Sequence, residues 1–190
     1  MFTKRQQQIV ETAIGLIAHK GIQNLTIKNL ALQIGISEPA LYRHFKNKLE
    51  IMKSILKYFQ LTMQPSMLEL KKEGKAIDKI NDFIFKHYEI LNQKQNLAKI
   101  IFAEANFQND ETLKDSLLLM MNNSQRLMQG IIQQAQENDE INTAVTAKNL
   151  TRMIIGSMRF MIIQWSMSGM IFDIEAEGKL LCEDLKKIMR

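Results

Sequence analysis

The chain has 190 residues, of which 46% are hydrophobic, enough for one large domain or two small ones with a real core. Its two prolines and eight glycines leave little room for a β-sandwich or a disordered tail. Residues 1–60 contain nine Lys or Arg and three Asp or Glu, which gives them a net charge of +6. Residues 61–190 contain sixteen Lys or Arg and seventeen Asp or Glu, which gives them a net charge of −1. This asymmetry indicates a polyanion-binding part joined to a part with another task, or else a solvated basic surface without a partner.

The single cysteine, Cys182, excludes an intrachain disulfide and is typical of a reducing compartment, so we expect a cytoplasmic protein. The first residues, MFTKRQQQIVE, lack the apolar segment of a signal peptide. The apolar run 153–172 has the length of a membrane span, but Arg159 near its middle would cost about 2.5–3.5 kcal/mol on insertion. A buried or interface helix and no membrane partner are therefore expected.

The first third of the chain reads as short helices with sharp ends. Apolar residues at spacings of three and four predict a first helix over about residues 4–20, with Gly21 after its last turn. Thr26 is a suitable N-cap for a second helix, which carries one apolar stripe and ends at Gly35. These boundaries predict two helices separated by a short connection.

A third helix is predicted to start after Ser37 and to run only to about Phe45. Pro39 falls in its first turn, where proline costs little because the N–H groups there lack intrahelical partners. Leu41 and Phe45 form its small apolar side, and the other faces carry Glu38, Ala40, Tyr42, Arg43 and His44. Two short helices joined by a glycine-bearing turn, with polar and aromatic groups on the second, predict a helix-turn-helix that binds double-stranded DNA.

The residues after the third helix predict the start of a longer one. Asn47 and Glu50 have the spacing of a capping box, in which Glu50 reaches back to the cap. Lys48 then lies at a helix amino terminus, where free N–H groups and the helix dipole already favour a phosphate. This helix is predicted to continue to about Phe59 and to lead into the second domain.

The stretch TIKNLALQIGISEPALYRHFKNKLEIM, residues 26–52, resembles the DNA-binding domain of the TetR family of bacterial transcriptional regulators. The resemblance covers about residues 5–60, and the run RFMIIQWSMSGMIFDIEAEGKLLCEDL is similar to the last two helices of many members. Residues 61–145 carry no such resemblance. It implies an all-helical homodimer that binds a palindromic operator and is usually released from it by a small molecule.

The resemblance also implies roles for individual residues. Contacts to the DNA backbone are implied for Thr26, Tyr42, His44 and Lys48. Contacts near base edges are implied for Lys28, Ser37, Glu38, Pro39, Ala40 and Arg43. The guanidinium of Arg43 matches guanine O6 and N7, a contact that discriminates between bases by about 1–3 kcal/mol. Glu38 either accepts from cytosine N4 or is only a favourable charge in a first helical turn.

Residues 61–190 are predicted to form a helical ligand-binding and dimerisation domain behind the DNA-binding domain of residues 1–60, so the fold class is all-α. Helical apolar stripes recur over residues 77–91, 110–136 and 150–165, and Asp173 is a suitable cap for the last helix. The final two helices are predicted to bury a face against a second copy through Ile154, Met158, Ile162, Leu181, Leu185 and Ile188.

Eleven of the thirteen methionines lie beyond residue 60. Methionine suits adaptable pockets for flexible apolar ligands, but it equally fills irregular helical cores, and both interpretations stay open. For a pocket that takes a small apolar or amphipathic effector, the candidate lining residues are Phe83, His87, Phe102, Met121, Met128 and Trp165.

Catalytic motifs are missing from the sequence, which contains no HExxH, Walker loop or GxGxxG. An enzyme, a cofactor and a metal site are therefore not expected. The leading prediction is a DNA-binding transcriptional regulator, most simply a repressor, that binds a palindromic operator as a homodimer and is released by an apolar or amphipathic ligand. The alternative is a helical sensor or carrier of lipid-like molecules whose basic end binds a protein partner or an anionic surface.

Overall fold

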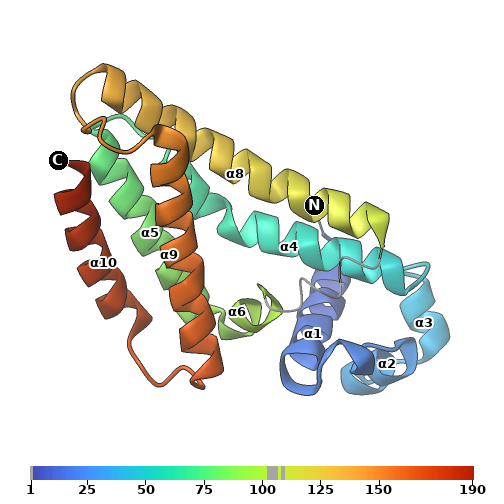
Figure 1. Cartoon of the computed structure of the whole chain (residues 1–190). Coiled ribbons are helices and arrows are strands. Elements are labelled where there is room, and N and C mark those ends of the chain that lie inside the picture. The colour runs from blue at the N-terminus through green and yellow to red at the C-terminus, as the bar shows by residue number, and fades with distance from the viewer. Residues whose placement is uncertain (1, 102–106, 108–109) are drawn as a thin grey trace. The chain divides into compact units, whose positions relative to one another are not determined.

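A computed structural model of the chain describes residues 2–101, 107 and 110–190. Every regular element in that part of the chain is a helix, which confirms the predicted all-α fold (Figure 1). In chain order the elements are α1 (Lys4–Lys20), the 3-10 helix η1 (Ile22–Asn24), α2 (Ile27–Ile34), α3 (Glu38–Tyr42), α4 (Lys48–Glu69), α5 (Ala76–Gln93), α6 (Gln95–Ile101), α8 (Glu111–Glu137), α9 (Ala147–Met167) and α10 (Ile174–Met189).

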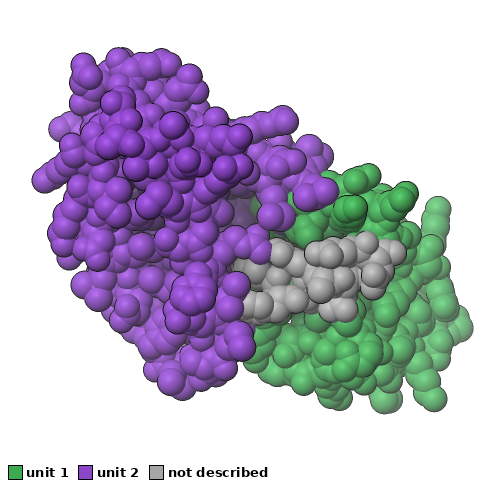
Figure 2. Space-filling model, viewed as in Figure 1, with its two compact units in different colours: residues 1–61, 95–117 green, residues 62–94, 118–190 purple. Residues whose placement is uncertain are grey.

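Two compact units make up the chain (Figure 2). Unit 1 comprises Met1–Leu61 and Gln95–Leu117, and unit 2 comprises Thr62–Lys94 and Leu118–Arg190. The inclusion of residues 95–117 in unit 1 had no signal in the sequence, because it depends on packing between segments far apart in the chain. The functional division between residues 60 and 61 stays a prediction.

Unit 1 is organised around α1, which packs against α2 and α6. Thr3 caps α1 in a reciprocal capping box with Gln6. The helix ends at Gly21, whose φ of 80° lies in a region that favours glycine, as its predicted capping role requires. The hydroxyl of Tyr58 on α4 donates to Glu11 Oε1 at 2.7 Å, which ties α4 to α1 within this unit.

Unit 2 is built on the packing of α10 against α5 and α9, and these three helices lie side by side (Figure 1). Helices α5 and α10 run antiparallel, because Asn92 near the end of α5 donates to Glu175 near the start of α10. The helices approach closely at Gly178, where an added Cβ would lie 2.5 Å from the Tyr88 ring. The α5–α10 contact therefore depends on a residue without a side chain.

The apolar run 153–172 lies mostly within α9. One face of α9 is buried in unit 2, and the indole N–H of Trp165 donates to the carbonyl of Phe172 at 3.0 Å. The prediction of a buried or interface helix is thereby confirmed. Among the residues that the structure describes, no helix is both long and apolar enough to cross a membrane.

Candidate functional site

The predicted helix-turn-helix is present in unit 1. Thr26 caps α2, and its side chain accepts the N–H of Asn29 at 3.1 Å. Gly35 ends α2 in the left-handed conformation, with φ 76° and ψ 38°. The N–H groups of Gly35 and Ile36 both donate to the carbonyl of Ala31, which satisfies the end of the helix in a tight turn. This turn places α3 directly after α2.

Helix α3 begins as predicted and ends earlier than predicted. Ser37 caps it by accepting the N–H of Ala40 at 3.3 Å, and Pro39 lies in its first turn. The helix ends at Tyr42 rather than near Phe45, because the N–H of His44 turns back to the carbonyl of Leu41 in a tighter i→i+3 bond. Leu41 and Phe45 are nevertheless both buried, so the short helix is held by the apolar contacts that the sequence predicted.

Most of the ten predicted DNA-contacting residues are exposed. Ala40 and His44 are partly buried, and the exposed set consists of Thr26, Lys28, Ser37, Glu38, Pro39, Tyr42, Arg43 and Lys48. Tyr42 exposes 49% of its surface although its neighbour Leu41 is fully buried. An aromatic side chain left this open, next in sequence to the exposed Arg43, suits contact with a nucleic acid. The contacts of these ten residues with DNA remain a prediction.

The start of α4 provides a suitable position for a phosphate. Asn47 Oδ1 accepts the N–H of Glu50 at 2.9 Å, as predicted. The Glu50 carboxylate reaches the N–H of Lys46 at 2.6 Å, one residue further back than an ordinary capping box requires. Lys48, the first residue of α4, is exposed, and within the described part of the chain it forms no ion pair. Its ammonium is therefore available to an anion.

The structure brings only some of the predicted effector residues into contact. The rings of Phe83 and His87 lie 5.6 Å apart on α5. His87 Nδ1 is 3.4 Å from Ser66 Oγ, and the Ser66 hydroxyl donates to the carbonyl of Met63, so His87 is assigned as the donor between them. Burial lowers the pKa of His87 to about 4, and the ring is therefore neutral at pH 7.

The other predicted effector residues differ in their surroundings. Met128 and Trp165 are buried in unit 2, whereas Met121 on α8 leaves 39% of its surface exposed. Met121 lies four residues after Leu117 and seven before Met128, on the same side of α8, but it is less covered by its neighbours than either of them. Phe102 lies outside the described residues. A common pocket for these residues stays a prediction.

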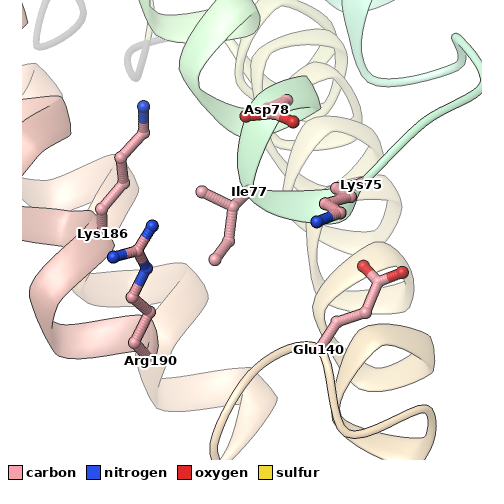
Figure 3. Close-up of a pocket in the computed structure, with 6 residues that line it drawn as sticks. All are labelled: Lys75, Ile77, Asp78, Glu140, Lys186 and Arg190. Atoms are coloured by element: carbon pink, nitrogen blue, oxygen red, sulfur yellow. The ribbon is translucent and has the colours of Figure 1, made fainter.

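A pocket that sequence analysis did not predict lies in unit 2, between the first turn of α5, the end of α10 and the connection after α8 (Figure 3). It has a volume of about 290 Å³ and is lined by Lys75, Ile77, Asp78, Glu140, Lys186 and Arg190. These residues come from three segments separated by more than forty positions. No local sequence pattern links such segments, so the pocket had no sequence signal.

The predicted dimer residues lie mainly on the buried side of their helices. Ile154, Met158, Ile162 and Leu185 are buried in the core of unit 2, and Leu181 is partly buried. Ile188 alone of the six is exposed. Four of these side chains therefore present no surface to a second copy. The opposite face of the two helices carries the exposed apolar side chains Met153, Phe160, Met167, Leu180 and Ile188.

Cys182 is buried against α5, and desolvation raises the pKa of its thiol to about 11. The thiol is therefore protonated at neutral pH, the state in which cysteine is a poor nucleophile and a poor metal ligand. Within the described residues, no group of three or more His, Cys, Asp or Glu side chains is placed to hold a metal ion.

A helix-turn-helix with exposed polar and aromatic groups, followed by a larger helical part, defines the class of DNA-binding transcriptional regulators. The model for bacterial regulatory proteins of the tetR family matches residues 9–55. A model for the carboxyl-terminal region of YsiA-like proteins matches residues 49–186, well over half of the chain. The chain belongs to the TetR family, and it is a DNA-binding regulator of transcription.

Similar proteins support this assignment along the whole chain. The fatty acid metabolism regulator protein of Bacillus subtilis is 25% identical over 180 residues, which cover 94% of this chain and 92% of that protein. The crystal structure of FadR from Bacillus subtilis in complex with stearoyl-CoA has a TM-score of 0.82 at 23% identity, with 97% and 99% of the two chains covered. FadR from Bacillus halodurans has a TM-score of 0.84 at 16% identity, with 98% and 96% covered. These two structural likenesses concern the fold.

Proposed function

We propose that the protein is a repressor that binds a palindromic operator as a homodimer and leaves it when a long-chain acyl thioester of coenzyme A binds. The proposal is carried by the match of the carboxyl-terminal family model over residues 49–186, by a relative named for fatty acid metabolism, and by the fold shared with FadR from Bacillus subtilis, which was solved in complex with stearoyl-CoA. The effector class is consistent with the amphipathic ligand that the sequence predicts. A regulator of this kind acts by binding alone, without catalysis.

The reading of operator DNA is assigned to α3 and the residues that flank it. Arg43 follows α3 with helical dihedral angles, φ −67° and ψ −20°, and its guanidinium forms no ion pair in the described structure. A free guanidinium at this position suits a bidentate contact to a guanine edge in the major groove. Lys48 suits a phosphate contact, which adds affinity without sequence preference.

The homodimer is proposed to form through the exposed apolar faces of α9 and α10. Phe160 lies seven residues before the end of α9, and Leu180 lies six residues after the start of α10. In an antiparallel helix pair joined by a short connection, two residues at similar distances from that connection lie at the same level along the helix axes. Phe160 exposes 59% of its surface and Leu180 exposes 55%, so both offer apolar area to a second copy.

Helix α4 is proposed to couple the effector to the DNA. It runs without interruption from Lys48, where a phosphate contact is proposed, to Glu69 in unit 2, and it contains Pro65. A ligand that displaces the last turns of α4 tilts its first turn, which changes the spacing of two recognition helices in a dimer. A coupling free energy of about 1–3 kcal/mol, or roughly 5–150-fold in affinity, is typical and is enough to clear an operator.

Fluorescence anisotropy with the DNA upstream of the protein's own gene tests the proposal. We expect specific binding that palmitoyl-CoA weakens and that palmitate or coenzyme A alone weakens less. Because coupling is reciprocal, operator DNA must weaken palmitoyl-CoA binding by the same factor in calorimetry. Equal palmitoyl-CoA affinity with and without operator excludes this switch. Failure to bind any DNA specifically, together with acyl-chain binding, favours the carrier of lipid-like molecules instead.

A further inference from the structure

The pocket at the junction of α5 and α10 lies wholly within unit 2, and most of its lining residues are charged. Ile77 forms its apolar centre, with Lys186 of α10 and Arg190, the residue after α10, on one side and Lys75 on the other (Figure 3). Its volume of about 290 Å³ is just below the range for small-molecule sites, about 300–1,000 Å³. The pocket therefore suits a small polar ligand, or one end of a larger ligand.

The charges that line the pocket favour an anion. The side chains of three cations, Lys75, Lys186 and Arg190, face those of two carboxylates, so the net charge of the lining side chains is +1. One of those carboxylates, Glu140, accepts the N–H of Ala76 at 3.1 Å. Among the described residues none of the three cations is within ion-pair distance of a carboxylate. Ammonium and guanidinium groups left with free donors are the side chains that bind phosphate oxygens.

A purely structural role does not explain the cations on α10. Lys or Arg side chains in the last turn of a helix often stabilise its unpaired carbonyls. At the end of α10, Asn142 already binds two of these carbonyls. Its backbone N–H donates to the carbonyl of Met189 at 2.9 Å, and its side-chain amide donates to the carbonyl of Ile188 at 2.7 Å. Lys186 and Arg190 are therefore not needed to satisfy the end of α10.

We propose that this pocket binds the phosphate groups of a small organic ligand through Lys186 and Arg190. Coenzyme A carries phosphate groups, so the inference rests on the proposed function if the ligand is an acyl-CoA. A free nucleotide or another phosphate ester has the same phosphate chemistry. Lys186 and Arg190 bind the phosphate oxygens, and Ile77 contacts the apolar part.

Calorimetry on the full chain with coenzyme A, ATP, inorganic pyrophosphate and palmitate tests the chemistry. We expect the probes that carry phosphate to bind and to bind more weakly at high salt. The double variant Lys186→Gln, Arg190→Gln should lose affinity for the phosphate probes by about tenfold or more, because two charge-assisted bonds are removed. Lys179→Gln, which removes an exposed cation of α10 outside the pocket, should change affinity less than about twofold.

The experiments distinguish failure of the pocket assignment from failure of the proposed function. The pocket assignment is overturned if no phosphate probe binds, or if the Lys186, Arg190 double variant binds them as the wild type does. If palmitoyl-CoA releases operator equally from the wild type and the double variant, and the two also bind ATP and pyrophosphate equally, the proposed function stands and the pocket assignment fails. If palmitoyl-CoA releases neither, but ATP or pyrophosphate binds through Lys186 and Arg190, the pocket is a phosphate site and the proposed effector is wrong.

Discussion

At the scale of single residues, Arg43 and Lys48 are both exposed cations, yet their positions predict different effects on DNA binding. Lys48→Ala should weaken binding to all sequences alike and reduce the slope of log K against log salt by about 0.9, as expected for one lost phosphate contact. Arg43→Ala should instead reduce discrimination at one base pair per half-site by about 1–3 kcal/mol. Titrations on operator and scrambled DNA at several salt concentrations measure both effects.

Lys179→Ala provides the control for these two variants, because it removes an exposed cation carried by unit 2. It should leave both the salt slope and the sequence preference near their wild-type values. If the Arg43 and Lys48 variants behave identically on the two DNAs, the division between base reading and phosphate contact is wrong.

His87 predicts a dependence of stability on pH. Its pKa in the folded state is about 4, below the ordinary 6.5, because burial disfavours the charged ring. Below pH 6.5 the unfolded chain therefore binds a proton that the folded chain does not, so stability falls as the pH drops from about 6.5 towards 4. The full effect is up to about 3 kcal/mol.

Urea unfolding of the wild type and of His87→Gln between pH 7 and pH 4 measures this contribution. The variant should lose much less stability over that interval, since it has no ring to protonate. NMR titration of the His87 ring carbons gives the pKa directly. A midpoint near 6.5 would contradict the desolvation of this side chain.

At the scale of helices, the α5–α10 contact depends on Gly178. An alanine Cβ there would lie 2.5 Å from the ring of Tyr88, which is itself fully buried. Gly178→Ala should therefore destabilise the protein by about 1–3 kcal/mol through overpacking. Gly130→Ala is the matched control on α8, where nothing lies within 4 Å of the added Cβ.

Gly130→Ala should stabilise the protein by up to about 1 kcal/mol, because alanine is the better helix former. The two substitutions add the same methyl group within a helix, so their difference isolates the packing against Tyr88. Thermal or urea unfolding measures both free energies. The same sign for both variants would show that α10 does not approach α5 as closely as the structure indicates.

At the scale of the whole molecule, the exposed apolar face of α9 predicts how the protein dimerises. Phe160→Asp places a charge where the proposed interface buries an aromatic ring, so the free energy of dimerisation should weaken by about 2 kcal/mol or more. Asn122→Asp introduces the same charge on an exposed position of α8 as the control. Analytical ultracentrifugation measures the dimer constant, and circular dichroism checks that the helices remain.

The same variant links dimerisation to DNA binding. If two copies bind two half-sites together, Phe160→Asp should weaken binding to a full operator far more than binding to a single half-site. A dimer constant unchanged by Phe160→Asp would place the interface elsewhere.

Much of the local structure was predictable from the sequence. The caps Thr26, Ser37 and Asp173 were identified correctly, because a cap depends only on residues two or three positions apart. The helix-turn-helix and its exposed side chains followed from the same short-range patterns. The basic charge of the first 60 residues could be counted from the sequence. The family could be identified as well, because the motif that identifies it is continuous in the chain.

Tertiary structure alone decided which faces are buried and which distant segments meet. Helix α9 carries two apolar stripes, one through Ile154 and Met158 and one through Met153 and Phe160, and both have the same helical period. Periodicity shows that a face is apolar, but packing against other helices determines whether the chain itself covers it. Tertiary packing also produces the pocket lined by Lys75 and Arg190, and it lowers the pKa of His87. Both depend on contacts across long stretches of chain, which residue order does not specify locally.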